Sequence, residues 1–201
     1  MSMPEVATRR LVVGLDLETT GLDQPGGHRI IEVAAVVYDL ETAKELGRYE
    51  TRINPQRGID VKAEAIHGIS YDSLIGKPLW ETVAPKLSAL LSRCEFMVAH
   101  NGVGFDAPFL WGEFLRIGVA LPSVKIVDTM LEGRWATPDG SVPNLGMLCW
   151  ASDVAYDKSK AHGATYDVEV MMECFFKYQP KGFFKMPTEP YRYTLPKEKR
   201  K

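Results

Sequence analysis

Residues 11–20 read Leu-Val-Val-Gly-Leu-Asp-Leu-Glu-Thr-Thr, and this stretch decides the fold class. Its apolar residues alternate, which predicts a half-buried strand from Leu11 to Thr19. The leucines of this strand share one face, and Asp16 and Glu18 share the other. The two carboxylates therefore project from the same face, with Cα atoms roughly 6.6 Å apart. Like charges this close raise each other's pKa unless a cation lies between them, so the pair indicates a divalent-metal platform.

Patterns further along the chain predict an α/β fold. Two more strands are expected soon after the first, and their short links favour antiparallel pairing. Helical spacing of apolar residues then alternates with short apolar runs. The expected strands cover residues 30–38, 48–53, 96–99 and 124–127, and the expected helices cover 79–91, 106–117, a segment from about 144, and 165–178.

The length of 201 residues is enough for one sizeable core and too short for two full domains. We expect one domain over residues 8–180. An extended or disordered basic tail should follow over residues 181–201, because the apolar periodicity ends there. A solubilising role and a strand-binding or partner-binding role both remain open for this tail.

Composition limits the class of protein. Apolar runs are interrupted before the ~18 residues that a membrane span needs, and the N-terminal residues lack a hydrophobic signal region. The three cysteines form no Cys-x-x-Cys pair, which argues against a disulfide framework or a cysteine zinc site. We therefore expect a soluble, cytoplasmic protein with no membrane partner.

The net charge of −2 argues against a protein that wraps duplex DNA without sequence preference. This objection weakens if some of the 26 acidic side chains hold divalent cations, because the cations then supply the positive field.

Three further residues are candidates for chemistry. Asp106 stands where a helix should begin, and a simple N-cap is an alternative interpretation. Asp167 lies near the start of the last predicted helix, and His162 lies in the loop before it. An imidazole there could act as a general base, although an isolated loop histidine is more often a surface residue.

Three segments together resemble the three motifs of the DEDDh (DnaQ-like) 3′→5′ exonuclease family, in the family's order. They read GLDLETTGLD at 14–23, VAHNGVGFDAPFL at 98–110 and HGATYDVEV at 162–170. Residues 65–69, Ala-Ile-His-Gly-Ile, are similar to another family segment between the first two motifs. The family includes the proofreading subunit of bacterial DNA polymerase III, RNase T, oligoribonuclease and exonuclease X. Three ordered motifs are far more specific than any one of them.

The resemblance implies an RNase H-like fold, with a mixed five-stranded sheet flanked by helices. It implies that Asp16, Glu18, Asp106 and Asp167 bind two Mg²⁺ or Mn²⁺ ions and that His162 is the general base. Gly163 and Val168 depart from the residues common in the family, which bears on subfamily more than on chemistry.

The resemblance also implies contacts with the terminal nucleotides of a strand. The backbone after the first motif, at Thr19, would contact the substrate, and Leu22 would be an apolar wedge. Ordinary packing inside the turn is an equal alternative for Leu22. His67, Asn101 and Phe105 are further candidates, and Phe105 fits a core position as well.

The expected function is removal of nucleotides from the 3′ end of single-stranded DNA, with release of nucleoside 5′-monophosphates. Alternatives within the family are an RNA-trimming 3′→5′ exoribonuclease and a proofreading component of a polymerase. A polymerase partner is compatible with the resemblance but not indicated, because only about twenty residues follow the last helix. A binding module that has lost the reaction is disfavoured, because all five chemical positions are present.

Overall fold

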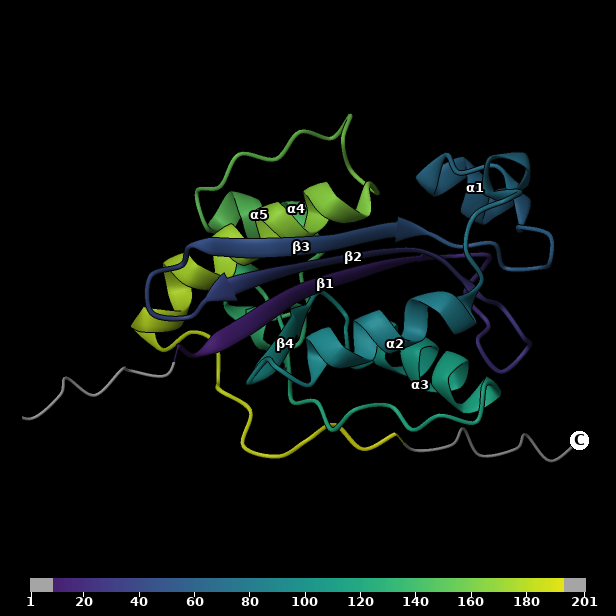
Figure 1. Ribbon diagram of the computed structural model, residues 1–201. Helices are drawn as coiled ribbons and strands as arrows, with labels where there is room; N and C mark the ends of the chain where they lie inside the picture. The colour runs from purple at the N-terminus through teal and green to yellow at the C-terminus, as the bar shows by residue number, and fades with distance from the viewer. Residues whose placement is uncertain (1–8, 194–201) are drawn as a thin grey trace, which may run out of the picture.

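Five strands form one mixed sheet in the order β3-β2-β1-β4-β5, shown in the computed structural model in Figure 1. The structure describes residues 9–193. Neighbouring strands pair antiparallel on one side of β1 and parallel on the other. The strands are β1 (Leu11–Thr19), β2 (Ile30–Asp39), β3 (Glu45–Arg52), β4 (Phe96–Ala99) and β5 (Ile126–Asp128).

Strand β1 is central because its residues can be buried on both faces. Val12 and Val13 are consecutive, point to opposite faces and are both fully buried. Val12 pairs with Phe96 of β4 in parallel register, and Glu18 lies opposite Glu32 of β2. The carboxyl ends of β1 and β4 therefore meet at one edge of the sheet, where the chain leaves both strands.

Helices cover both faces of the sheet, as Figure 1 shows. Buried side chains of α2 and α3 pack against one face, and those of α4 and α5 pack against the other. A shorter helix, α1, lies beyond the end of the sheet and contributes no buried residue. The helices are α1 (Val61–His67), α2 (Trp80–Leu91), α3 (Asp106–Arg116), α4 (Leu145–Ala151) and α5 (Ala164–Tyr178), with 3₁₀ turns η1 (Tyr71–Leu74), η2 (Glu132–Ala136) and η3 (Gln179–Lys181).

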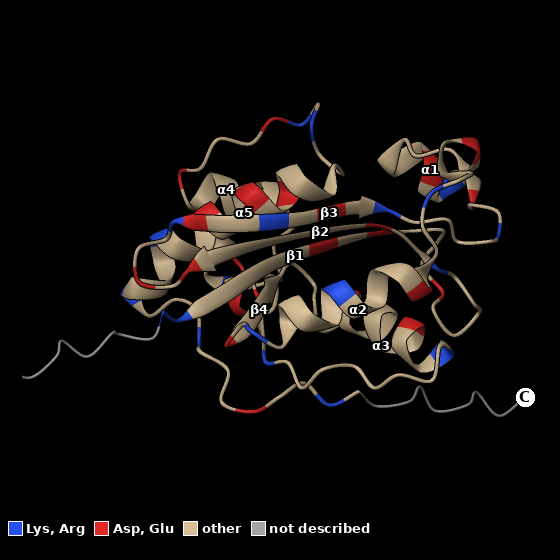
Figure 2. Cartoon of the chain, in the orientation of Figure 1, with Lys and Arg blue, Asp and Glu red and all other residues tan. Residues whose placement is uncertain are grey.

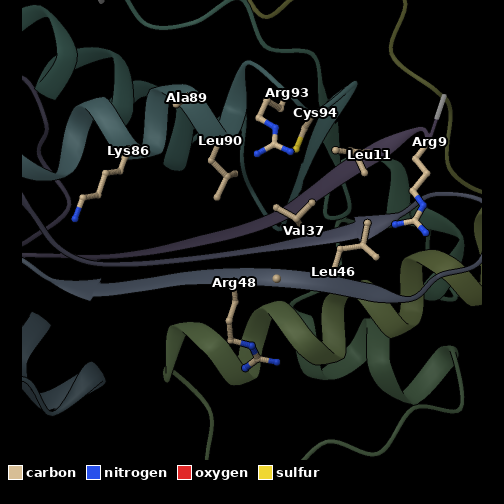
Figure 3. Close-up of a pocket in the computed structure, with 11 residues that line it drawn as sticks. Arg9, Leu11, Val37, Leu46, Arg48, Lys86, Ala89, Leu90, Arg93 and Cys94 are labelled. Atoms are coloured by element: carbon tan, nitrogen blue, oxygen red, sulfur yellow. The ribbon is translucent and has the colours of Figure 1, made fainter.

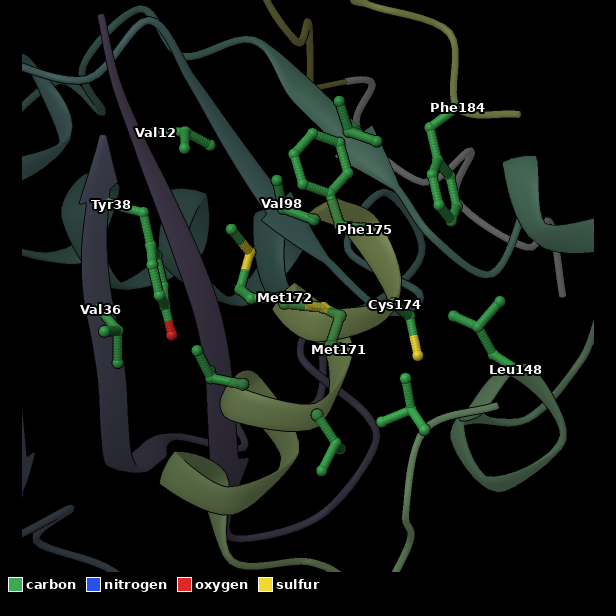
Figure 4. Packing of buried hydrophobic residues seen from close by; sticks show 14 of the residues in the cluster. Val12, Val36, Tyr38, Val98, Leu148, Met171, Met172, Cys174, Phe175 and Phe184 are labelled. Atoms are coloured by element: carbon green, nitrogen blue, oxygen red, sulfur yellow. The ribbon is translucent and has the colours of Figure 1, made fainter. Parts of the chain in front are cut away.

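A glycine in β1 sets how closely α5 approaches the sheet. A Cβ atom at Gly14 would lie 2.6 Å from Met172 Cγ and 2.8 Å from Val168 Cγ1, too close for a real contact. In Figure 4, Met172 and Phe175 occupy the side of α5 that faces the sheet. Because Asp167 immediately precedes Val168, this close approach also brings the start of α5 to β1.

Most expected elements are confirmed within one or two residues. Strand β3 begins earlier than expected, at Glu45, and helix α1 was not expected at all. Both elements are largely exposed, so neither has the apolar periodicity on which the expectations depended. Strand β5 is likewise shifted towards its carboxyl end, to Ile126–Asp128.

The segment after η3 lies against the body of the protein. Phe184 is buried in the core beside α5. The backbone amide of Tyr191 donates to the carbonyl of Val124 over 2.7 Å. The ring of Tyr193 stacks on Trp111 of α3, with centroids 3.8 Å apart. The most basic part of the expected tail, 194–201, lies outside the described residues, and the domain boundary at 180 stays a prediction.

Within residues 9–193, no helix combines the length and the apolar character needed to cross a lipid bilayer.

Candidate active site

Four carboxylates from three elements gather where β1 leaves the sheet. Asp16 and Glu18 lie on β1, Asp106 is the first residue of α3, and Asp167 lies in the first turn of α5. The negative charges of Asp106, Glu18 and Asp167 all act on Asp16 and raise its pKa. Figure 2 shows acidic positions in the half of β1 that ends at Thr19. The fold thus joins residues up to 151 positions apart into one acidic site.

Each of these carboxyl groups has a pKa above its ordinary value. Loss of solvent is the largest cause for Asp16, followed by the charge of Asp106. Loss of solvent, then the charge of Glu32, raises the pKa of Glu18 to about 8. Burial also raises the pKa of Asp106 and of Asp167. The protein alone therefore does not balance the negative charge that it concentrates here.

Two carboxylate oxygens of the acidic site are buried without a hydrogen-bond partner. Asp106 Oδ1 and Asp167 Oδ1 are buried and have no hydrogen-bond partner. Buried polar atoms are normally paired, and carboxylate oxygens are the ligands that Mg²⁺ and Mn²⁺ prefer. In the described part of the chain, no three His, Cys, Asp or Glu side chains lie close enough together to hold a metal ion as they stand. The donor set fits divalent cations, and ion binding would draw the four carboxylates closer together.

His162 is exposed and directly adjoins this cluster. Its backbone amide donates to Asp167 Oδ2 over 3.0 Å, which fixes the loop against the first turn of α5. Its φ is 62°, in the left-handed region that non-glycine residues rarely adopt. Strained residues of this kind occur preferentially at functional sites. His162 is therefore held next to Asp167 through its backbone, with its side chain exposed to solvent.

The exit from β1 is held by threonine side chains. Thr19 is buried, and its Oγ1 donates to the carbonyl of Gly21 over 2.8 Å. Thr20 Oγ1 accepts the amide of Arg29 over 3.0 Å. These bonds present Leu22 to solvent with 81% of its surface exposed. The alternative that Leu22 packs inside the turn is therefore wrong, and its side chain is free to contact a ligand.

His67 ends α1 and lies next to the same strand exit. Its Nδ1 accepts the amide of Ile69 over 3.0 Å, and its Nε2 is buried without a partner. Burial lowers the pKa of His67, while the backbone of Thr19 and the charge of Glu32 oppose this shift. His67 is therefore held beside Thr19 at the edge of the acidic site, with its Nε2 buried.

Asn101 and Phe105 belong to the loop between β4 and α3. The amide of Asn101 donates to Asp128 Oδ1 over 3.1 Å, and Asn101 has a left-handed φ of 67°. The ring of Phe105 lies 4.9 Å from that of Phe109 and packs on the core while remaining half-buried. Phe105 is thus partly a core residue, and both loop residues lie close to Asp106.

Two acidic residues outside the predicted set behave differently. Asp128 accepts backbone amides from the loop that includes Asn101 and from the two residues Met130 and Leu131, so its carboxylate is satisfied locally. Glu32 was also left outside the predicted site, but it faces Glu18 across the β1–β2 pair and raises its pKa. Arg52 Nε donates to Glu32 Oε1 over 2.9 Å. The sequence shows Glu32 as an acidic residue within an apolar strand, and the strand register places it beside Glu18.

The RNase T family model, described as "Exonuclease", matches residues 13–175, a span that contains all four carboxylates and His162. This chain belongs to the exonuclease family. The resemblance to DnaQ-like 3′→5′ exonucleases is thereby confirmed.

Curated relatives agree with this assignment. The DNA polymerase III subunit epsilon of Rickettsia felis is 35% identical over 167 residues, which cover 80% of this chain and 70% of the relative. The subunit of the same name from Escherichia coli is 31% identical over 182 residues, covering 86% and 72% of the two chains. The exonuclease is therefore similar to replication proteins over most of its own length.

Solved structures confirm the RNase H-like fold with its mixed sheet. Escherichia coli exonuclease I in complex with a dT13 oligonucleotide superposes with a TM-score of 0.74 at 20% identity. The match covers 87% of this exonuclease but only 43% of the exonuclease I chain. The same enzyme in a zinc-bound complex with single-stranded DNA gives a TM-score of 0.73 at 18% identity. At these identities the likeness establishes the fold alone.

Proposed function

We propose that this exonuclease removes nucleotides one at a time from the 3′ end of single-stranded DNA and releases nucleoside 5′-monophosphates. The observation that carries the proposal is the acidic site itself. Asp16, Glu18, Asp106 and Asp167 adjoin one another with raised pKa values, and two of their oxygens are buried and unpaired. A site of this kind suits hydrolysis of a phosphodiester with divalent cations.

Four residues would hold two Mg²⁺ or Mn²⁺ ions, namely Asp16, Glu18, Asp106 and Asp167. Asp16 has the central place, because the charges of the other three all act on it. Two ions of this class supply activation of a water molecule and stabilisation of the departing oxygen. Ionised carboxylates are needed for binding, so the raised pKa values oppose binding at low pH.

His162 would accept the proton of the attacking water. It is exposed next to Asp167, and its backbone amide is bound to that carboxylate. An imidazole changes protonation state near neutral pH, which suits a general base under ordinary conditions. Asp167 would thus have two tasks, cation binding and positioning of the histidine loop.

The 3′-terminal nucleotides would lie between the exit from β1 and the loop before α3. Leu22 is exposed and can insert against a base, and the backbone near Thr19 can contact the terminal sugar. His67 would border this exit beside Thr19, and Asn101 and Phe105 would border the other side. Stacking and backbone contacts of this kind tolerate any base, so we expect little sequence preference.

Two alternative functions use the same active-site chemistry. The similarity to polymerase III subunit epsilon over about 70% of the relative favours a proofreading component, which would work beside a polymerase. The second is an RNA-trimming exoribonuclease, which differs in the contacts that it makes with the 2′-hydroxyl group of the substrate. Exonuclease I, which shares this fold, was solved with a dT13 oligonucleotide, so single-stranded DNA is the first substrate to test.

Digestion of matched 5′-labelled single-stranded DNA and RNA tests the proposal. With Mg²⁺, the DNA should shorten from its 3′ end as a ladder, and EDTA or Asp16→Ala should abolish the ladder. The RNA arm and a mismatched primer-template arm separate the two second candidates. Absence of cleavage of every strand in Mg²⁺ and in Mn²⁺ would contradict the proposal.

A further inference from the structure

A groove lies between α2 and the edge strand β3, away from the acidic site. We call it the α2–β3 groove; Leu11, Val37 and Leu46 form its floor, and Ala89 and Leu90 form its helical wall (Figure 3). It has a volume of about 640 Å³, within the range of known ligand sites. Leu46 is 39% exposed within it, so the floor is incompletely covered by the protein's own side chains.

The groove exists because the sheet is wider than the helical layer that covers it. Val37 and Leu90 pack only partly on the core, and Gly47 of β3 supplies no side chain to fill the remaining space. A Cβ atom at Gly47 would meet no atom within 4 Å. The position therefore has room for a larger side chain, which provides a way to close the groove.

Positive charge surrounds this apolar floor. Arg9, Lys86 and Arg93 line the groove, and none of its described lining residues is acidic. Arg9 approaches Asp39 only to 3.8 Å with its side chain 71% exposed. Other basic residues of the protein form ion pairs, but within residues 9–193 Lys86 and Arg93 form none.

One further arginine at the groove is already neutralised. Arg48 binds Glu45 and Glu50 on β3 and Glu169 on α5. Figure 3 shows its guanidinium turned away from α2. The cations available to an occupant are therefore Lys86 and Arg93 on α2, with Arg9 at the end of the groove.

The position and lining of the groove argue against a path for the substrate strand. Leu11 begins β1 and Asp16 lies five residues further along it, roughly 17 Å away in an extended strand. None of the described lining residues is aromatic, so the groove lacks the platforms on which bases stack. A mixed surface of aliphatic floor and cationic rim fits an acidic peptide with aliphatic side chains better.

We propose that the α2–β3 groove docks a short acidic peptide segment of a partner protein. An aliphatic side chain of the segment inserts between Val37 and Leu90, and its carboxylates pair with Lys86 and Arg93. Arg9 receives a further carboxylate at the end of the groove. Docking there leaves the acidic site open, so the partner recruits the enzyme without occupying its substrate path.

Fluorescence anisotropy tests this proposal with a defined probe. The probe is a fluorescein-labelled pool of short peptides whose outer positions are Asp or Glu and whose inner positions are Leu, Ile or Val. Two control pools replace the inner residues by Ser or the outer residues by Lys. The acidic aliphatic pool should bind saturably, and each control pool should bind at least about tenfold more weakly.

Variants locate the binding to the groove. The double variant Lys86→Glu with Arg93→Glu and, separately, Gly47→Trp should each weaken binding of the acidic pool about tenfold or more. The matched control, Lys158→Glu with Lys185→Glu, changes net charge equally at exposed positions elsewhere and should leave binding unchanged. Thermal unfolding verifies that every variant is folded. This readout does not depend on nuclease activity.

Three outcomes would overturn the proposal. The first is no saturable binding of the acidic pool by the wild-type protein, and the second is equal weakening by the matched control. The third concerns a labelled single-stranded deoxythymidine oligonucleotide measured in parallel. If the groove variants weaken the oligonucleotide and spare the peptides, the groove serves nucleic acid instead.

Discussion

Glu18 of β1 lies opposite Glu32 of β2 in the antiparallel register, so two carboxylates share one face at the exit from the sheet. Glu32 is the carboxylate whose charge raises the pKa of Glu18 most, after the effect of burial. Arg52 binds Glu32 over 2.9 Å and holds it in place. Strand β2 therefore places a further carboxylate beside the two on β1, and the motif pattern does not reveal it.

Replacing Glu32 by Gln should lower the pKa of Glu18 from its value of about 8, because one neighbouring negative charge is removed. The measurement is a carbon-13 NMR titration of the carboxyl groups in metal-free protein. Glu189→Gln, at a distant exposed position, is the control and should leave Glu18 unchanged. An unaltered Glu18 pKa in the Glu32 variant would show that the two carboxylates do not interact.

Stability in the absence of metal should depend on pH through Glu18. Its pKa is about 8 in the folded protein against 4.5 ordinarily, so the folded state binds the extra proton between these values. Stability from this group is therefore lost as pH rises from about 5 to about 8. In EDTA, Glu18→Gln should gain stability relative to wild type across this range.

Divalent cations should reverse this trend. Added Mg²⁺ should raise the melting temperature of the wild type more at pH 8 than at pH 6, because ligands must be deprotonated to bind. Calorimetry with Mg²⁺ and with EDTA measures both effects. An identical response of wild type and Asp16→Ala to Mg²⁺ would remove Asp16 from the set of metal ligands.

Variants of His162 should separate chemistry from stability. His162→Ala and His162→Gly should both lower turnover by about 10²- to 10⁴-fold, as expected for loss of a general base. The left-handed φ of 62° is strained for alanine and not for glycine, so the Gly variant should be the more stable by about 1 kcal/mol. Turnover assays and urea unfolding check the two effects, and Mg²⁺ affinity should persist in both variants. Full turnover in either variant would exclude His162 as the base.

Gly14 should be intolerant of a side chain. Gly14→Ala would place a Cβ 2.6 Å from Met172 Cγ, so α5 or the methionine has to move. We expect a loss of about 1–3 kcal/mol in the free energy of unfolding, together with lower activity, because α5 carries Asp167. A double variant with Met172→Ala should recover part of both losses. Denaturant unfolding that shows no coupling between the two positions would contradict this packing.

The stacked pair of Tyr193 and Trp111 should fasten the segment after α5 to α3. Tyr193→Ala should destabilise the protein by about 1 kcal/mol, while Tyr193→Phe should retain most of the stacking. In limited proteolysis, the segment after α5 should be cut faster in the Ala variant than in the wild type or the Phe variant. Equal cleavage of the wild type and both variants would show that the stack does not hold the segment.

Local sequence patterns determined much of this architecture. The alternation of β1, the apolar run of β4 and the helical spacing of α2 and α5 are all visible without coordinates, because burial imposes a period on apolar residues. The three motifs identified the family and the candidate residues at the same time. Elements with a weaker period were placed less well: the exposed α1 was missed, and the bounds of β3 and β5 were shifted.

The tertiary structure decided what surrounds the motifs. Strand register places Glu32 beside Glu18, and the close approach of α5 at Gly14 brings Asp167 to Asp16. The exposure of Leu22 and the α2–β3 groove also depend on contacts between distant segments. A sequence pattern indicates which residues are buried. The pKa values, unpaired atoms and grooves depend instead on which residues are neighbours in the folded protein. That pairing is a property of the folded chain, so only the structure could determine it.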